Sequence, residues 1–182
     1  MGNQSAKMEY RKLDKLGIET SLLGFGCMRF PTDASGKIDE EKSQKMLDEA
    51  MARGVNYYDT AWPYHGGQSE VFVGKALKKY PRESFYLATK LPCWDVKCVE
   101  DAERIFNKQL ERLQTDYVDF YLLHALNKGS FQNMVDAGVL PFLDKLKEEG
   151  KIKYIGFSFH DSYEAFEYIA KYREWDFCQI QY

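Results

Sequence analysis

The amino-acid sequence predicts a parallel α/β fold, a TIM-type (β/α)8 barrel shortened to about six βα units behind a short N-terminal hairpin. Apolar runs and helical patterns alternate along the 182 residues with a period of roughly 30 residues, the length of one βα unit. The alternative, a doubly wound sheet, normally carries a glycine-rich turn after its first strand. Here residues 24–26, Gly-Phe-Gly, are not followed by a third glycine that opens a helix. Ionisable side chains also stand at the ends of successive predicted strands, where barrel enzymes keep their catalytic groups.

The predicted elements at the N-terminus are a hairpin, a strand and a helix. Residues 9–13 and 18–21 flank a Lys-Leu-Gly turn and predict two short antiparallel strands. The apolar run 22–26 predicts the first strand of the barrel. A helix is expected over 39–53, because Asp39 is a good N-cap residue, two glutamates follow it and a glycine stands just beyond the C-terminal end.

The remaining predicted elements alternate between strands and helices. Residues 99–113 form the clearest amphipathic helix, and the near-continuous apolar run 117–123 suits a parallel strand that is covered on both faces. In order, we expect strand 55–58, helix 69–80, strand 85–89, helix 99–113, strand 117–123, a polar loop over 127–132, a helix ending at 149, strand 152–157, a helix from 161 or 162 to about 173, and strand 177–182.

Four ionisable side chains stand at or just beyond the ends of three successive predicted strands. Asp59 follows the second strand, and Tyr64 lies in the loop behind it. Lys90 ends the third strand and His124 ends the fourth. In a parallel barrel these strand ends meet at one rim. Each residue alone has an ordinary explanation, such as a solvated charge, a turn or packing. The functional hypothesis therefore rests on the position at one rim that the four residues share.

Together these groups can provide a general acid. A phenol has a reference pKa of ~10 and is a poor acid at neutral pH, but a nearby ammonium group favours its phenolate form. Asp59 can orient and neutralise Lys90, and His124 can hydrogen-bond a substrate oxygen. The set suits protonation of a carbonyl oxygen while hydride, which no side chain supplies, arrives from a cofactor. Schiff-base chemistry on Lys90 is an alternative, but it leaves the spacing of Asp59 and Tyr64 without a role.

Five segments resemble the aldo-keto reductase family, and especially its bacterial and archaeal oxidoreductase-type members. Residues 59–70, DTAWPYHGGQSE, are similar to the family signature D-T-A-x-x-Y-x-x-G-x-S-E. Residues 23–29 resemble the first barrel strand of the family, and 85–90 resemble its third strand, which ends in the catalytic lysine. The segments 116–124 and 150–158 resemble D-Y-(I/V)-D-L-x-x-x-H and G-K-I-R-x-I-G-x-S. The match runs in order through most of the chain.

The resemblance implies a role for each ionisable residue at the rim. Tyr64 would donate the proton, and Lys90, paired with Asp59, would tune it. His124 would orient the carbonyl of a small-molecule aldehyde, ketone or quinone. The candidate catalytic residues are therefore Asp59, Tyr64, Lys90 and His124.

The resemblance also implies a cofactor, NADP(H), extended across the barrel mouth. Ser158 and Gln179 would hold its nicotinamide amide, with His160 replacing the asparagine that family members usually carry. The candidate cofactor-binding residues are Met28, Arg29, Asp59, Ser158, His160 and Gln179. The candidate substrate-pocket residues are Phe30, Trp62, His65 and Trp94, with packing an equal alternative for Trp62.

Composition argues against several other classes of protein. A net charge of -3 lacks the basic footprint of nucleic-acid binding, and no run of ~18 apolar residues is present that would span a membrane. The four cysteines form no C-x-x-C pair, so we expect no metal site and a reducing, cytoplasmic location with free thiols. Residues 1–8 are expected to form a disordered tail rather than a signal peptide, which leaves 9–182 as one incomplete barrel domain.

The length is short for the predicted fold, because a (β/α)8 barrel typically needs ~250 residues. We expect the seventh and eighth strands to be absent, together with the loops behind them that clamp the cofactor in relatives. Three interpretations follow. The chain is a fragment of a longer reductase, a short form whose open sheet edges pair with a partner or a second copy, or a catalytically incompetent barrel that acts by binding.

Overall fold

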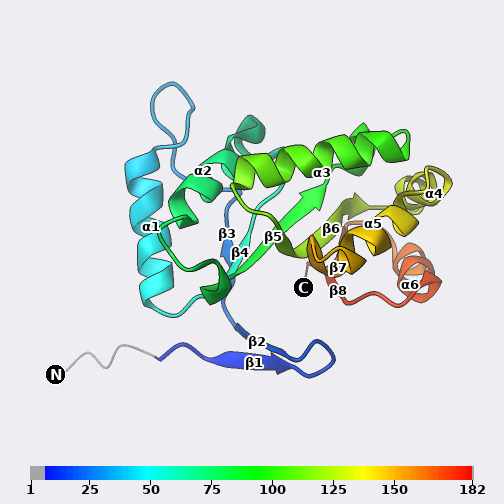
Figure 1. Cartoon of the computed structure of the whole chain (residues 1–182), viewed down its shortest axis with the longest axis horizontal. Coiled ribbons are helices and arrows are strands. Elements are labelled where there is room, and N and C mark those ends of the chain that lie inside the picture. The colour runs from blue at the N-terminus through cyan, green and yellow to red at the C-terminus, as the bar shows by residue number, and fades with distance from the viewer. Residues whose placement is uncertain (1–6, 182) are drawn as a thin grey trace.

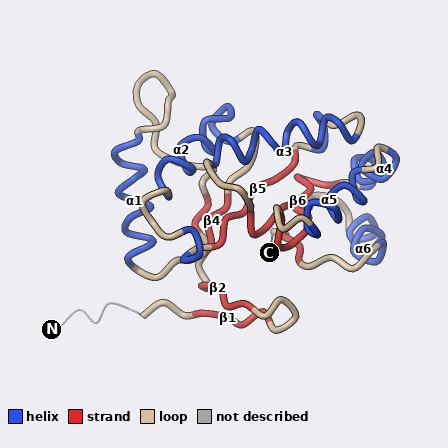
Figure 2. Tube along the Cα trace, viewed as in Figure 1, coloured by secondary structure: helices blue, strands red, loops and turns tan. Residues whose placement is uncertain are grey.

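The computed structural model describes residues 7–181, and it forms a curled six-stranded sheet with helices along its outer face (Figure 1, Figure 2). The strands are parallel and their order is β3-β4-β5-β6-β7-β8, so each pairs with its neighbours in sequence, as in a barrel. A separate antiparallel hairpin consists of β1 (Tyr10–Leu13) and β2 (Ile18–Ser21). The predicted fold, an incomplete barrel behind a hairpin, is confirmed.

Helices connect the successive strands of this sheet. The strands are β3 (Phe25–Gly26), β4 (Tyr57–Asp59), β5 (Tyr86–Leu91), β6 (Val118–Leu126), β7 (Ile152–Phe159) and β8 (Phe177–Gln179). The helices are α1 (Glu40–Ala52), α2 (Gln68–Leu77), α3 (Val99–Leu113), α4 (Lys128–Asp136), α5 (Val139–Glu148) and α6 (Tyr163–Tyr172). Two helices, α4 and α5, lie between β6 and β7, whereas one α-helix makes each of the other connections.

Local chemistry explains where the helices begin and which face they bury. The carboxylate of Asp39 caps α1 by accepting a hydrogen bond from the Lys42 amide at 3.1 Å. The hydroxyl of Ser162 caps α6 in the same way. In α3 the predicted apolar stripe is buried, with Phe106 and Leu113 packed into the core between the helices and the sheet.

The predicted loop over 127–132 is wrong, because residues 128–136 form α4. Asn127 and Ser130 make a capping box: the Asn127 side chain accepts from the Ser130 amide at 2.8 Å, and the Ser130 hydroxyl accepts from the Asn127 amide at 3.0 Å. Polar residues in this stretch start a helix rather than replace one. Phe131 and Met134 then bury the inner face of that helix.

Several element ends also differ from prediction. Strands β5 and β6 continue two and three residues past the expected ends at 89 and 123, while α2 stops at Leu77 instead of at 80. The predicted strand 177–182 is longer than β8, which ends at Gln179 because only Phe177, Cys178 and Gln179 pair with β7. Tyr182 lies outside the described residues.

The sequence predicts a disordered N-terminal tail over residues 1–8. Residues 1–6 lie outside the described residues. Met8 is half-buried and packs against the core. Within residues 7–181, no helix has both the length and the apolar composition that crossing a bilayer would require.

An aromatic cluster fills the concave side of the sheet. Phe120 on β6 is at its centre, with ring centroids 5.1 Å from Tyr57, 4.9 Å from Tyr154 and 4.9 Å from Phe177. Leu16 in the hairpin turn packs onto the same cluster. The interior of the curled sheet is therefore filled by side chains, as barrel interiors are. The side chains that can reach a ligand lie at the ends of the strands.

The hairpin lies across the amino-terminal end of the sheet and contacts both sides of it (Figure 1). On the β4 side, the Ser21 amide donates to the side-chain oxygen of Asn56 at 2.8 Å. On the β7 side, the Tyr154 hydroxyl donates to the carbonyl of Leu16 at 3.3 Å. This arrangement closes the end of the sheet opposite to the carboxyl ends of the strands.

Gly74 marks a close approach of two helices. A Cβ atom at this position of α2 would lie 2.5 Å from the Arg112 carbonyl oxygen and 2.7 Å from the Leu113 Cα. We expect Gly74→Ala to lower the free energy of unfolding by about 1–3 kcal/mol, because backbone atoms of α3 would have to move. Urea unfolding of both proteins measures this difference.

The matched control for Gly74→Ala is Val71→Ala, which places alanine at an exposed position of the same helix. The control is expected to unfold within about 0.5 kcal/mol of the wild type. An unfolding midpoint for Gly74→Ala equal to or above that of the wild type contradicts the close approach.

Candidate active site

The carboxyl ends of three adjacent strands bring the four predicted catalytic residues together. Asp59 ends β4, Lys90 is the penultimate residue of β5, and His124 lies near the end of β6. Tyr64 begins the 3-10 turn that follows β4. We refer to Asp59, Tyr64, Lys90 and His124 as the tetrad.

Lys90 is the hub of the tetrad. Its Nζ donates to both carboxylate oxygens of Asp59 at 2.7 Å, to the Thr60 carbonyl at 2.8 Å and to the Tyr64 hydroxyl at 3.3 Å. Lys90 is only 1% exposed, so its charge depends on these partners instead of on water. An ammonium group bonded to a phenol oxygen stabilises the phenolate that remains after proton donation.

Asp59 is the counterion of Lys90, and it offsets the free-energy cost of burying the ammonium group. Burial raises the pKa of Asp59 above its ordinary value, and the Lys90 ammonium acts in the opposite direction. Because both carboxylate oxygens accept bonds from Lys90, we assign the ionised form. The side chain of Gln179 on β8 also lowers the pKa of Asp59, to a smaller extent than Lys90 does.

His124 is held as a neutral imidazole. Burial, followed by the charges of Lys90 and His160, lowers the pKa of His124 to about 4. Its ring packs edge-on to Tyr64, with centroids 5.9 Å apart, and 5.2 Å from the ring of Trp94. A neutral imidazole can donate one ring N–H to a carbonyl oxygen without adding a second cation beside Lys90.

A β-bulge directs His124. The register between β6 and β7 shifts after Leu123, and Ala125 adopts a left-handed conformation with φ of 51°. The Ala125 amide then donates to the Ser158 hydroxyl of β7 at 2.8 Å, in place of a ladder partner. Bulges beside active sites re-aim side chains, and this one follows His124 directly.

The depressed pKa of His124 predicts a pH-dependent contribution to stability. An unfolded chain binds a proton at this histidine near pH 6.5, whereas the folded chain binds it only near pH 4. Between these values the unfolded state binds more protons, so the contribution is complete above about pH 6.5 and is lost as the pH falls towards 4. Urea unfolding midpoints of wild type and His124→Gln, measured from pH 4 to 7, test this.

We expect the wild-type midpoint to fall more steeply with acidification than that of His124→Gln. All other titrating groups are common to the two proteins, so the difference between the curves isolates this imidazole. Two parallel curves would contradict a neutral, buried His124.

The predicted cofactor residues lie around the same strand ends. Ser158 is buried, and its hydroxyl accepts the Ala125 amide bond, which leaves its own O–H free to donate. Gln179 and His160 are exposed, as are Met28 and Arg29 after β3. Ser158 and Gln179 are direct partners in the β7–β8 register. These residues offer donors and acceptors to a carboxamide group.

The four predicted substrate-pocket residues differ in how they contact the site: one is exposed beside the tetrad, and the others are held in contacts with neighbouring residues. Trp94 is 55% exposed and contacts His124, so it lies at the mouth of the site. Phe30 is buried and packs edge-on against Phe72 of α2, at 5.0 Å between centroids. His65 holds this arrangement, because its Nε2 accepts a hydrogen bond from the Phe30 amide at 3.0 Å.

Trp62 is held against the outer helices. Its ring centroid is 3.8 Å from the Arg112 guanidinium carbon of α3, a cation–π contact. This contact favours packing, one of the two alternatives for this residue.

A buried polar network that is absent from the predicted site lies beneath the tetrad. Gln109 and Arg112 of α3 join Glu70 of α2 and Thr89 of β5 in one hydrogen-bonded network. A signal was present, because Gln109 falls on the apolar stripe of α3. A fully buried amide on such a stripe needs polar partners.

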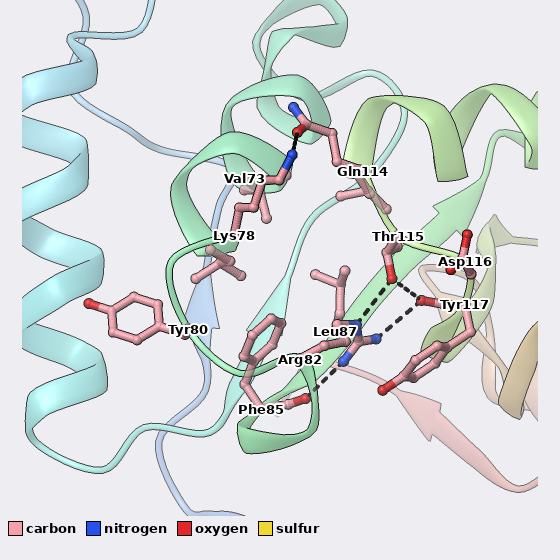
Figure 3. A pocket seen from close by; sticks show the side chains of 13 residues that line it. Val73, Lys78, Tyr80, Arg82, Phe85, Leu87, Gln114, Thr115, Asp116 and Tyr117 are labelled. Carbon is pink, nitrogen blue, oxygen red and sulfur yellow. Dashed lines mark hydrogen bonds between the residues drawn. The ribbon is translucent and has the colours of Figure 1, made fainter.

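A cavity of about 330 Å³ lies away from the tetrad, between α2, α3 and the amino ends of β5 and β6 (Figure 3). The guanidinium of Arg82 crosses its floor and donates to the carbonyls of Phe85 and Tyr117 and to the hydroxyl of Thr115. It also donates to the buried carboxylate of Asp119 at 2.6 Å. The guanidinium of Arg82 is thus used in hydrogen bonds that hold loops together. We therefore assign this cavity no catalytic role.

No group of three or more His, Cys, Asp or Glu side chains within 7–181 is arranged to hold a metal ion. The tetrad itself provides a phenol, an ammonium–carboxylate pair and a neutral imidazole at the strand ends.

The fold and the tetrad together define the class of protein. The chain belongs to the aldo/keto reductase family, whose sequence model matches residues 22–182. L-galactose dehydrogenase of Arabidopsis thaliana is 37% identical over 156 residues, which cover 82% of this chain and 48% of that protein. The chain spans about half the length of the curated relatives it matches.

Solved structures agree with this assignment. The holo form of aldo-keto reductase AKR11C1 from Bacillus halodurans has a TM-score of 0.79 and 35% identity, covering 96% of this chain and 58% of that one. An aldo/keto reductase from Klebsiella pneumoniae in complex with NADP and acetate has a TM-score of 0.69 and 28% identity, covering 85% of this chain and 51% of that one.

Proposed function

We propose that the protein reduces an aldehyde, ketone or quinone carbonyl to an alcohol, with hydride from NADPH and a proton from Tyr64. The observation that carries this proposal is the 3.3 Å contact between Lys90 Nζ and the Tyr64 hydroxyl, with the same Nζ bonded to both oxygens of Asp59. A phenol in this setting is a general acid whose conjugate base is already stabilised.

Each of the four tetrad residues has its own role in this reaction. Tyr64 holds the proton at Oη and passes it to the carbonyl oxygen, and Lys90 stabilises the phenolate that remains. Asp59 neutralises Lys90, so the site gains no uncompensated charge. His124, as a neutral donor, orients the carbonyl oxygen towards Tyr64. The oxygen gains the proton and the carbon gains the hydride, which balances the reduction.

The residues present fit a nicotinamide group. NADPH, when bound, supplies the hydride. Ser158 retains a free O–H, and its register partner Gln179 has an exposed amide, so together they offer a donor and an acceptor to the carboxamide. His160, Met28 and Arg29 are the further residues we assign to the cofactor. The NADP complex of the relative from Klebsiella pneumoniae supports this choice of cofactor.

We further propose a cytoplasmic location and association through the open sheet edges. The buried Cys27 and Cys93 are free thiols, which suits a reducing compartment. In the described sheet β3 and β8 each have one neighbouring strand, and unpaired strand edges favour pairing with another strand. A second copy of this chain or further strands would close the sheet.

The test has two steps, binding and turnover. Quenching of intrinsic fluorescence by NADPH and by NADH measures binding, and loss of cofactor absorbance with a panel of aldehydes, ketones and quinones measures turnover. We expect binding and turnover with at least one carbonyl, and stronger binding of NADPH than of NADH. A chain that binds neither cofactor and reduces no carbonyl overturns the proposal and favours the incompetent barrel that acts by binding.

A further inference from the structure

The buried network beneath the tetrad is centred on Glu70, in the first turn of α2. Glu70 is fully buried, yet its carboxylate accepts three hydrogen bonds. They come from the Thr89 hydroxyl at 2.6 Å, the Gln109 amide at 2.7 Å and the Arg112 guanidinium at 3.1 Å. A buried carboxylate carries a large desolvation penalty that apolar packing would avoid, so its partners indicate what it holds in place.

The first arm of this network reaches Lys90. The Gln109 amide that bonds to Glu70 also donates to the Lys90 backbone carbonyl at 3.0 Å, and its oxygen accepts from the Tyr121 hydroxyl at 2.7 Å. Gln109 is fully buried, so these contacts fix its position. The strand residue that carries the tetrad ammonium is thereby tied to α2 and α3 through side chains, in addition to the sheet ladder.

The second arm reaches the loop that carries Tyr64. Arg112 bonds to Glu70 and lies over the ring of Trp62, which stands between Asp59 and Tyr64. Beyond Tyr64, a Cβ atom at Gly67 would lie 3.4 Å from an Arg112 nitrogen, so the guanidinium also contacts the far end of the turn. Arg112 thus contacts the Tyr64 segment on both sides.

We propose that Glu70 is the positioning residue for the Lys90–Tyr64 pair, fixing Lys90 through Gln109 and Tyr64 through Arg112. One carboxylate then sets the distance between two groups that lie 26 residues apart in sequence. The kinetic part of this inference rests on the proposed function, while the structural part does not. Glu70 makes no hydrogen bond to any of the four tetrad side chains. It acts through Gln109 and Arg112.

The variant that tests this is Glu70→Gln, which keeps the size of the side chain and removes its charge. Carbon-13 labelling at the tyrosine Cζ reports the state of each phenol, and the Tyr64→Phe variant identifies the Tyr64 signal among the 13 tyrosines. We expect the Tyr64 signal in Glu70→Gln to shift relative to wild type, because the surroundings of the phenol change when Lys90 and the Tyr64 loop are no longer held in place. This readout requires no turnover, so it separates failure of the inference from failure of the proposed function.

A matched control is Asp119→Asn. Asp119 is also a buried carboxylate bonded to an arginine, but it lies at the other end of β6 and contacts Arg82 and Lys153. We expect both variants to lose stability and only Glu70→Gln to move the Tyr64 signal. If the two variants behave alike at Tyr64, or if neither moves the signal, Glu70 has a merely structural role.

A second variant keeps the test valid if Glu70→Gln fails to fold. Trp62→Leu removes the cation–π contact of the second arm and leaves the Glu70 carboxylate paired. We expect the Tyr64 signal to move in the same direction. Where carbonyl reduction is measurable, kcat is expected to fall about 10- to 100-fold with little change in cofactor binding, because small displacements of reacting groups have effects of this size. An unmoved signal and an unchanged kcat overturn the second arm.

Discussion

Replacing Tyr64 with phenylalanine is expected to reduce carbonyl reduction by about 10²- to 10⁴-fold while leaving the chain folded, because the variant loses its general acid. Stability should change little. Lys90 keeps its bonds to Asp59 and to the Thr60 carbonyl when the 3.3 Å contact to the phenol is removed. Turnover with saturating cofactor and carbonyl, compared with the urea unfolding midpoint, measures both effects.

A matched control for Tyr64→Phe is Tyr10→Phe. The Tyr10 hydroxyl donates to the Gly54 carbonyl at the hairpin end of the molecule, far from the tetrad, so this variant loses a phenol bond without touching the site. Equal turnover in wild type and Tyr64→Phe would exclude Tyr64 as the proton donor. Equal losses in Tyr64→Phe and Tyr10→Phe would attribute the effect to folding.

The second large effect is expected at Lys90. Lys90→Met removes the ammonium that bonds to both oxygens of Asp59. The Asp59 carboxylate, which is largely buried, then has no counterion. Breaking a buried ion pair on one side costs about 3–5 kcal/mol. We therefore expect Lys90→Met to lower the free energy of unfolding by about this amount at pH 7, as measured by urea unfolding. The deficit should shrink at lower pH, where Asp59 can take up a proton.

The double variant Asp59→Asn/Lys90→Met decides whether the unpaired charge is the cause. It removes both charges, so we expect it to be more stable than Lys90→Met alone, with a favourable interaction term in the double-mutant cycle. Additive losses in the cycle would mean that the two side chains contribute independently, contrary to the geometry.

The alternation of strands and helices could be predicted because each βα unit carries its own local signals. The apolar stripe of α3, the N-cap of α1 and the apolar run of β6 are short-range patterns, and the structure contains all three elements. Helix α4 was missed because the cap residues Asn127 and Ser130 are equally common in loops. Only the burial of Phe131, which is a tertiary fact, separates the two cases.

The tetrad could be predicted because strand ends in a parallel barrel share one rim, so strand order alone brings Asp59, Lys90 and His124 together. The residues that hold the tetrad could not be predicted in this way. The position of Gln109 on the apolar stripe of α3 indicates that its amide needs polar partners. It does not identify Glu70, which Gln109 and Arg112 contact across an interface between two helices. Trp62 illustrates the same limit, since its position in the signature does not indicate which way its ring faces.

The hairpin has a consequence for the order in which this chain folds. Its turn bonds to Tyr154 across 138 residues and to the Trp175 carbonyl across 160 residues, whereas the βα units form between near neighbours. Contacts of such long range are slow, because the loop they close is costly in entropy. The contact of Ser21 with Asn56 can form once β4 has been made, whereas the bonds to Tyr154 and Trp175 must wait for β7 and for the segment that follows α6, so the hairpin completes its docking late in folding.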